Sequence, residues 1–521
     1  MKWLEYYKGK TVLVTGHTGF KGSWLCVMLE MAGAKVVGYA LPPEKDAVLF
    51  DCSGAAARMV SVEGDIRDRA HLQEVFHTYQ PQVVFHLAAQ PIVRTSYEQP
   101  VYTYETNVMG TVNLLDCVRN TPGVQSVLNV TTDKVYENKE WEWGYRENDP
   151  LDGFNPYSNS KSCSELVTHS YKKSFLDEKG IAVSTARAGN VIGGGDFSRD
   201  RIIPDCVRSA LQGEEIIIRN PYSIRPFQHV LEPLAAYMQI AAAQAMEHEK
   251  AGYYNVGSKE ADCVTVGALA DLFCRAWGHD LKWKNVCEEG PHEAKFLKLD
   301  CSHIKYALGW KPCWDIRTAI EKTVEWTRVN ALANREIVLI APGKTSETEK
   351  DRVKKYIERE APVVIGVNAV NISYEFDYLF INNAIRYNYA REIYPKQFSE
   401  TKKILLSNIK TEPDQNEIIV NFNRVVKRGW EHFDNAVINM LRLLDKLNVK
   451  KVKLVGFDGF KHQYNESYAD RTLPTLNPDN HWDELNIEIK EMFCDFMESK
   501  KDSMQIDFLT ESIFQNYKEN I

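Results

Sequence analysis

The sequence predicts an α/β protein: a Rossmann-type parallel sheet with a small α/β capping region, followed by a second α/β, Rossmann-like domain. Three observations predict this class. Short β-rich runs alternate with helical stretches from Lys10, the alternation becomes irregular after about Ile192, and a strand–helix–strand pattern begins again near residues 331–335. Strands that alternate with helices indicate βαβ units and a parallel sheet, so the restart indicates a second sheet.

The first domain is expected over residues 1–335. Its sheet part spans about 1–192, and the segments that carry the alternation are TVLVTG, SWLCVMLEMAG, AKVVGYAL, PQVVFHLAA, VQSVLNVTT and GIAVSTARAGNVIG. The capping part lies mainly in 193–335, because segments such as RPFQHVLEPL and KPCWDIRTAIEKTVEWTRVN do not continue that rhythm.

The second domain is expected over residues 336–521. It opens with the strand EIVLIAPG, the charged helix KDRVKKYIERE and the strand APVVIGVN. No Pro-, Gly- or Ser-rich linker precedes it, so we expect a close junction at a helix end.

Composition narrows the class of protein. The 521 residues are 44% hydrophobic and 26% charged, which is typical of globular domains with real cores. A net charge of -8 argues against a general nucleic-acid binder, since such proteins neutralise phosphates with surplus Lys and Arg. The eleven Cys include no CxxC pair, so neither a disulfide framework nor a metal site is expected. The start lacks an apolar signal region and no apolar run approaches a membrane span, so we expect a cytoplasmic protein.

A glycine-rich turn predicts a dinucleotide site in the sheet part. It follows the first strand, precedes an apolar helix and contains Gly16, Thr18, Gly19, Phe20 and Gly22. Glycines permit a tight turn, and the helix N-terminus presents free N–H groups to a pyrophosphate. The second strand ends without an acid for the adenosine ribose and without an Arg cluster for a 2′-phosphate, so this pattern does not choose between NAD and NADP.

Asp65 and Ile66 follow the expected third strand. A carboxylate there can accept the adenine amino group. The alternative is that Asp65 caps the helix that begins near Arg69.

Tyr157 and Lys161 lie four residues apart, on one face of an expected helix. An ammonium lowers the pKa of a nearby phenol, and a tyrosinate can take the proton of a sugar hydroxyl while hydride leaves the same carbon. Thr132, at the end of the strand SVLNVTT, can hydrogen-bond the same hydroxyl. We therefore expect all three to be catalytic.

Asp133 and Lys134 follow Thr132 at the carboxyl edge of the sheet, where open α/β sheets bind ligands. Oxidation at C4 of a sugar acidifies the C5 proton, and loss of the C6 hydroxyl then needs an acid and a base. A protonated Asp and a deprotonated Lys can divide these roles. The alternative is a surface ion pair at a strand end.

The chain from about Lys8 to Trp326 resembles the extended short-chain dehydrogenase/reductase family and, within it, the CDP-glucose 4,6-dehydratases. The motifs that carry the resemblance are GHTGFKGSWL, HLAAQPIVRTSY, TTDKVYEN, NPYSNSK, RAGNVIGGGDF, RIIPD, RPFQHVLEPL and GPHEAKFLKLD. Lys134 is the most discriminating residue, since the similar dTDP-glucose and GDP-mannose enzymes carry Glu there.

This resemblance implies a hydro-lyase with bound NAD that converts CDP-glucose to CDP-4-keto-6-deoxyglucose, in deoxysugar and polysaccharide biosynthesis, as a homodimer or higher homo-oligomer. Tyr157 would oxidise C4, Asp133 and Lys134 would assist water loss across C5 and C6, and hydride would return to C6. Further implied cofactor contacts are Leu87, Ala88, Ala89 and Asn107. Implied substrate contacts are Gln90, Arg94, Asn190, Arg219, Arg225 and His292.

In the second domain the APGKT turn is not a Walker motif, because Val338 stands where the first Gly is needed. The region 336–497 is distantly similar to the nucleotide-binding fold of bacterial sialyltransferases that use CMP-sialic acid. This similarity implies nucleotide contacts from Gly343, Asn368, Gly456 and Asp458, and a base role for His481. Ordinary helix capping and a structural histidine are the alternatives.

Two questions stay open at this point. A nucleotide-sugar epimerase is the other reading of the first domain, because both reactions form a ketone at C4. The second domain is either a catalytic unit that transfers or modifies a cytidine-activated sugar, or an oligomerisation or docking module.

Overall fold

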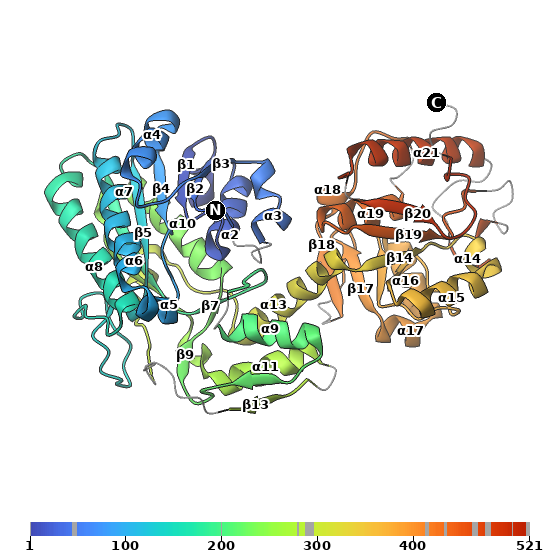
Figure 1. Ribbon diagram of the computed structural model, residues 1–521. Coiled ribbons are helices and arrows are strands. Elements are labelled where there is room, and N and C mark those ends of the chain that lie inside the picture. Colours follow the sequence, from blue (N-terminus) through green and yellow to red (C-terminus); the bar gives the residue numbers. More distant parts are fainter. Residues whose placement is uncertain are drawn as a thin grey trace. The chain divides into compact units, whose positions relative to one another are not determined.

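The computed structural model describes residues 2–43, 49–198, 201–278, 281–286, 296–411, 416–431, 435–460, 467–474, 481–502 and 504–516. It divides into two compact units, Met1–Thr327 and Arg328–Ile521, which are treated separately below (Figure 1). The expected domain boundary at 335/336 lies a few residues beyond this division. None of the helices described is long and apolar enough to cross a membrane.

A seven-stranded parallel sheet forms the centre of the first unit, in the order β11-β6-β5-β4-β1-β2-β3. The chain order reverses between β1 and β4, which creates a crevice at the carboxyl ends of these two strands. The strands are β1 Thr11–Thr15, β2 Lys35–Ala40, β3 Val60–Glu63, β4 Val83–His86, β5 Ser126–Thr132, β6 Ala182–Ala188 and β11 Tyr253–Val256.

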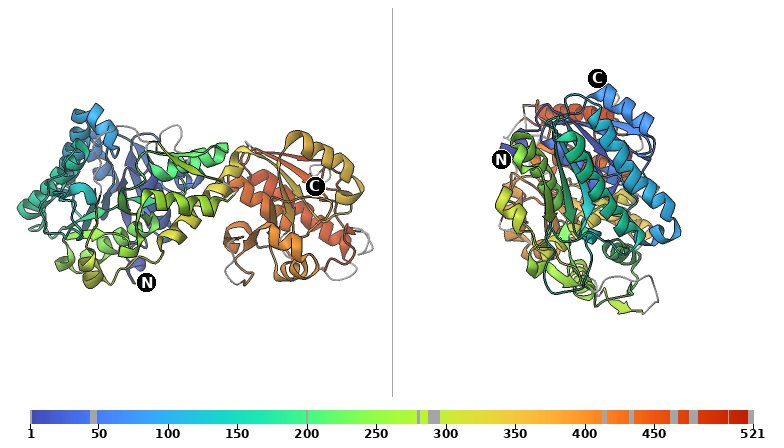
Figure 2. Two further views of the ribbon diagram at one scale, coloured as in Figure 1. Left: turned by 90° about the horizontal axis from the view of Figure 1, so that it is seen from below. Right: turned by 90° about the vertical axis from the view of Figure 1, so that its left-hand side faces the viewer.

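Helices cover both faces of this sheet, as the views in Figure 2 show. One face packs its apolar side chains against α2 Phe20–Met31 and α10 Leu231–Met246. The other face is covered by α4 Arg69–Tyr79, α7 Gly110–Arg119 and α8 Pro156–Tyr171. The strands are buried on both sides, which is why they read as nearly continuous apolar runs. Shorter helices are α1 Lys2–Glu5, α3 Leu49–Cys52, α5 Val93–Glu98, α6 Pro100–Tyr104 and α12 Ser302–Leu308.

The capping part is less continuous than the sequence indicates. Residues 193–335 were expected to lie mainly outside the sheet, but α10 packs on β5 and β6, and β11 pairs in parallel with β6. The capping elements are the strand pairs β7–β10, β9–β12 and β8–β13, with α9 Ile202–Gln212, α11 Val266–Trp277 and α13 Ile316–Asn330. The strands are β7 Val191–Ile192, β8 Ile216–Ile218, β9 Ile224–Pro226, β10 Gln228–His229, β12 Cys263–Thr265 and β13 Trp283–Asn285.

The second unit is built on its own seven-stranded parallel sheet, in the order β18-β17-β16-β15-β14-β19-β20. The strands are β14 Glu336–Ile340, β15 Val363–Val367, β16 Tyr378–Ile381, β17 Lys402–Leu406, β18 Glu417–Val420, β19 Lys451–Val455 and β20 Gln505–Phe508. One face packs against α19 Ala436–Lys446 and α21 Trp482–Ser499, and the other against α15 Lys350–Glu360 and α16 Ala384–Ile393. Shorter helices are α14 Thr345–Thr348, α17 Pro395–Glu400 and α18 Phe422–Val425. The predicted second α/β domain is therefore present.

A buried histidine predicts acid sensitivity of the first unit. His86 contacts the hydroxyls of Thr15 (2.8 Å) and Thr111 (3.2 Å), and burial lowers its pKa to about 3. It stays neutral in the folded state but protonates near pH 6.5 once unfolded, so its stabilising effect is full above pH 6.5 and falls as the pH decreases. When the pH falls from 6.5 to 5, protonation of His86 in the unfolded state should therefore reduce the free energy of unfolding by roughly 2 kcal/mol.

Denaturant unfolding of the wild type and of His86→Gln at several pH values measures this effect. The variant, which lacks the titrating ring, should lose less stability between pH 6.5 and 5. Equal losses in the two proteins would contradict the assignment.

Candidate active site

The glycine turn after β1 forms a cradle at the crevice between β1 and β4. Gly16 has a left-handed φ of 74°, and a Cβ atom there would lie 2.8 Å from the Ala88 nitrogen. A Cβ on Gly22 would lie 2.1 Å from the Gly16 carbonyl oxygen. The N-cap residue of α2, Gly19, supplies no side-chain acceptor, so the first N–H groups of this helix face the crevice. These features fit a dinucleotide pyrophosphate.

A single cavity of about 2050 Å³ runs from this cradle to the capping part. Most of the predicted cofactor residues line it: Gly16, Thr18, Gly19, Phe20, Gly22, Asp65, Ile66, Leu87, Ala88, Ala89, Tyr157 and Lys161. Asn107 lies behind the wall, where its amide donates to Ser160 (2.9 Å) and accepts from the backbone N–H of Gln90 (2.8 Å). Asn107 therefore ties α8 to the loop after β4.

Asp65 lines the cavity just after the end of β3. Hydrogen bonds from Arg67 lower the pKa of its carboxyl group, and the closest is 2.7 Å. The alternative interpretation, that Asp65 caps the next helix, is wrong: the N-cap of α4 is Asp68, which accepts from the His71 backbone.

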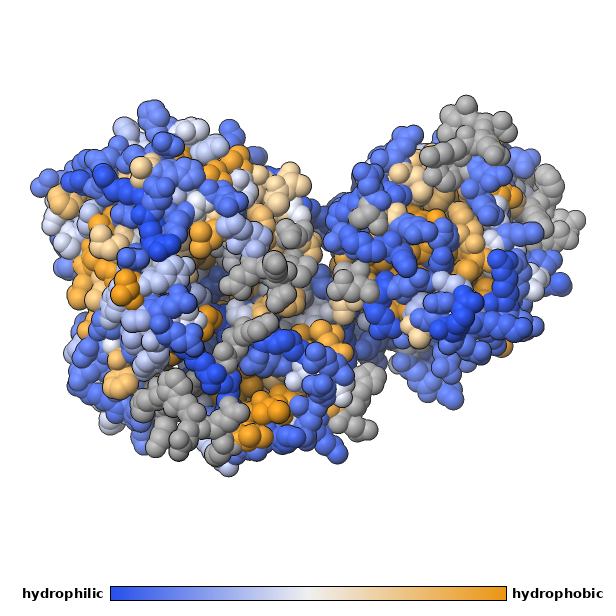
Figure 3. All heavy atoms as spheres, in the orientation of Figure 1, coloured by the Kyte–Doolittle hydropathy of each residue, from blue (hydrophilic) through white to orange (hydrophobic). Residues whose placement is uncertain are grey.

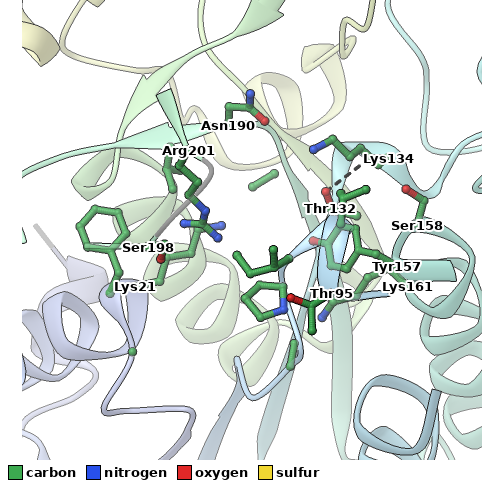
Figure 4. A pocket seen from close by; sticks show the side chains of 18 of the residues that line it. Lys21, Thr95, Thr132, Lys134, Tyr157, Ser158, Lys161, Asn190, Ser198 and Arg201 are labelled. Atoms are coloured by element: carbon green, nitrogen blue, oxygen red, sulfur yellow. Dashed lines mark hydrogen bonds between the residues drawn. The ribbon is translucent and has the colours of Figure 1, made fainter. Parts of the chain in front are cut away.

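Tyr157 and Lys161 lie one turn apart on α8, as their spacing predicts. The helix begins in a fixed position, because the Asn155 side chain caps it and Pro156 occupies its first turn. Figure 4 shows Tyr157 and Lys161 beside Thr132 on one side of the cavity. All three line the cavity and are largely buried.

The charge state of Tyr157 differs from the sequence expectation. Burial is the largest influence and raises the pKa of its phenol, although a hydrogen bond with Thr132 and the charge of Arg201 lower it. Burial also lowers the pKa of Lys161 to about 8, and its ammonium donates to the Val130 carbonyl at 3.2 Å. Desolvation of both groups therefore outweighs the expected effect of Lys161 on Tyr157.

Asp133 and Lys134 follow directly from the end of β5. Asp133 is 1% exposed, and burial raises the pKa of its carboxyl group. Its Oδ1 accepts from the Thr132 hydroxyl at 3.0 Å, whereas Oδ2 has no hydrogen-bond partner among the described residues. Lys134 lines the cavity and extends toward Asn190 (Figure 4). The surface ion pair offered as the alternative does not describe a carboxyl group this deeply buried.

The expected substrate contacts fall into three groups. Arg94, Asn190, Arg219 and Arg225 line the cavity. Gln90 does not line it, because its side chain donates to the Thr103 hydroxyl (2.8 Å) and accepts from the Ile92 backbone (2.6 Å). His292 lies outside the described residues.

The sequence analysis missed three cationic residues of the cavity lining, Lys21, Lys139 and Arg201. Lys21, in the glycine turn, has its pKa lowered to about 8 by burial and by the charges of Arg201 and Lys161. Arg201, just before α9, points into the cavity opposite Tyr157 and donates to Asp196 at 3.1 Å. A lysine inside a glycine turn that is expected to bind pyrophosphate is a signal that was available for Lys21. Arg201 begins the RIIPD motif, but only the fold brings it to this site.

In the second unit, three of the proposed nucleotide contacts meet where the strand order reverses, between β14 and β19. A Cβ on Gly343 would lie 2.2 Å from the Gly456 carbonyl oxygen, so these turns need glycine to pack. Asp458 accepts a 2.7 Å hydrogen bond from the Thr345 backbone N–H. The Asp458 carboxylate thus accepts from a backbone N–H that a phosphate would otherwise use, which favours the capping interpretation.

The other two residues of this unit also have partners within the protein. Asn368, with φ 56°, donates to the Asn382 side chain at 2.8 Å. His481 is exposed and contacts Glu484 at 2.8 Å. Their geometry gives the weak similarity to sialyltransferases no further support.

Comparison with known proteins identifies relatives that are nucleotide-sugar 4,6-dehydratases. A family model described as GDP-mannose 4,6 dehydratase matches residues 13–323. The CDP-glucose 4,6-dehydratase of Salmonella typhimurium is 48% identical over 330 residues, which cover 62% of this chain and 91% of the relative. A probable dTDP-glucose 4,6-dehydratase of Sinorhizobium fredii is 29% identical and covers 60% and 92%.

Solved structures show the same fold for the first unit. The dTDP-glucose 4,6-dehydratase of Streptomyces venezuelae, solved with NAD and TYD, is 26% identical with a TM-score of 0.53, covering 61% of this chain and 97% of that one. The Bacillus anthracis dTDP-glucose 4,6-dehydratase, solved with NAD, is 22% identical with a TM-score of 0.53, covering 61% and 97%. Through residues 13–323, which make up more than half of its length, the chain belongs to the GDP-mannose 4,6 dehydratase family of hydro-lyases.

Proposed function

We propose that the first unit uses NAD to convert CDP-glucose to CDP-4-keto-6-deoxyglucose. The observation that carries this proposal is that Tyr157 and Lys161 on α8 line the same cavity as Lys134 after β5. The buried carboxyl group of Asp133 precedes Lys134 in the chain. The first pair serves oxidation at C4, and the second serves elimination across C5 and C6. The identity of the nucleotide rests on the 48% identical relative.

Oxidation at C4 is assigned to Tyr157. Its phenolate takes the C4 hydroxyl proton, and Thr132 positions that hydroxyl through its own side chain. Bound NAD supplies the hydride acceptor and later the hydride donor. Because burial raises the pKa of Tyr157, its phenolate gains from the positive charge of Arg201, which acts in the opposite direction.

Elimination is assigned to Asp133 and Lys134. Asp133 holds its proton because burial raises its pKa, so it can deliver that proton to the departing C6 hydroxyl. Lys134 is assigned as the base that removes the C5 proton and that delivers a proton to C5 after hydride reaches C6. The net change is loss of one water, and proton exchange between Tyr157 and Asp133 restores the starting state.

Turnover with CDP-, UDP-, dTDP- and GDP-linked hexoses tests the proposal. Proton NMR should show a new C6 methyl signal, with CDP-glucose giving the highest kcat/KM. An epimerase would produce no methyl group. Equal or faster dehydration of another nucleotide sugar would refute the choice of nucleotide while leaving the reaction in place.

We further propose that the first unit forms a homodimer through α5, α6 and α8. These helices pack against one another and expose Val101 (70%) and Leu166 (57%). Figure 3 shows apolar side chains among hydrophilic ones on the left-hand side of this unit, where α8 lies. Exposed apolar surface of this kind is typical of interfaces between subunits.

Leu166→Lys should shift the sedimentation coefficient toward that of the monomer. The matched control is Met31→Lys, which places the same charge at an exposed apolar position on α2. An unchanged coefficient for Leu166→Lys would exclude this face.

A further inference from the structure

Glu165 is a buried carboxylate that the proposed reaction does not use. It lies on α8 one turn after Lys161 and two turns after Tyr157, so the three side chains share one face of the helix. It is 1% exposed. A charge this deeply buried is retained only where partners compensate it, so its surroundings indicate its role.

The partners of Glu165 join α8 to the two strands that end at the active site. Oε1 accepts from the hydroxyl of Thr131, the residue before Thr132 on β5. Oε2 accepts from Thr185 at 2.8 Å and from the Arg187 guanidinium at 2.9 Å, both on β6. Arg187 is itself 2% exposed and donates to the Tyr136 hydroxyl at 2.9 Å. This network fixes the carboxylate behind the catalytic edge of the sheet.

The surroundings of Lys161 are otherwise unfavourable for its positive charge. Lys21 on α2 adds a like charge, and His86 on β4 is buried nearby as a neutral ring. Burial lowers the pKa of Lys161 to about 8, and Glu165 acts in the opposite direction by raising it. Glu165 therefore favours the charged form of Lys161.

We propose that Glu165 is a positioning residue: it holds the end of β5 against α8 and places a negative charge one helical turn from Lys161, on the same face of the helix. This inference rests on the proposed function, because it concerns the groups that act on the cofactor and the sugar. The proposed effect of Glu165 on Lys161 is electrostatic. A neutral amide in the same place would keep the shape but lose the charge.

The experiment measures two pH profiles on the full chain, kcat/KM for CDP-glucose and the Kd of NADH followed by fluorescence. Glu165→Gln should move the alkaline midpoint of both profiles down by about one pH unit, as expected for loss of one nearby charge. Thr185→Val is the matched control, since it removes a hydrogen bond to the same carboxylate and leaves the charge. Its midpoints should equal those of the wild type, with a lower melting temperature.

The outcomes separate the possible failures. If Glu165→Gln lowers the melting temperature but leaves both midpoints in place, Glu165 is merely structural and the proposal is overturned. If the single variant does not fold because Arg187 has lost its counter-ion, the double variant Glu165→Gln/Arg187→Gln replaces the whole buried pair and should show the same downward shift. Wild-type protein that binds no NADH and dehydrates no nucleotide sugar would instead overturn the proposed function.

Discussion

Tyr157→Phe is expected to lower kcat for dehydration by about 10³-fold with little change in KM, since general acid–base catalysis contributes 10²–10⁴-fold. The ring stays in place against Thr132, so the cavity keeps its shape and only the phenolic oxygen is lost. Steady-state turnover of CDP-glucose, with NADH binding as a check of the cofactor site, measures the effect.

The matched control is Tyr171→Phe, near the end of the same helix, where the ring packs against Phe175 outside the cavity. It should retain wild-type turnover. A Tyr157→Phe enzyme with more than a tenth of wild-type kcat would contradict the assignment of the base at C4.

Lys134→Met is expected to separate the two halves of the reaction. The variant should still oxidise C4, because Tyr157 and Lys161 are untouched, but elimination should slow by about 10²–10³-fold. Single-turnover absorbance should then show NADH accumulating, whereas it stays low in the wild type. The matched control is Lys179→Met, at an exposed lysine in the turn before β6 and outside the cavity lining, and it should behave as wild type.

Full-rate dehydration by Lys134→Met would remove Lys134 from the mechanism and transfer the role of the base to another group. Slow dehydration without NADH accumulation would instead place Lys134 in the oxidation step.

Local periodicity made the placement of Tyr157 and Lys161 predictable. Tyr157 and Lys161 are four residues apart, so any helix through them puts both on one face, and the glycine turn needs only its own strand and helix. Asp133 and Lys134 were found for a similar reason, since a strand end at a sheet edge is visible in the sequence. The predicted strands and helices of both units follow the same local periodicity.

Burial and long-range pairing were not predictable in this way. Nothing local reveals that β11 returns to the main sheet, because its partner β6 lies far away in sequence. The raised pKa of Tyr157 depends on how many elements close over it, which spacing cannot report. The resemblance implied that Gln90 contacts the substrate and Asn107 the cofactor, but the side chain of Asn107 hydrogen-bonds the backbone of Gln90 inside the wall.

Transfer of the C4 hydrogen to C6 tests the central claim most directly. CDP-glucose that carries deuterium at C4 should give CDP-4-keto-6-deoxyglucose with that deuterium in the C6 methyl group, as read by NMR and mass spectrometry. In D₂O the same product should take up solvent deuterium at C5, where Lys134 exchanges its proton. Deuterium that remains at C4, or a product without a methyl group, would contradict the account.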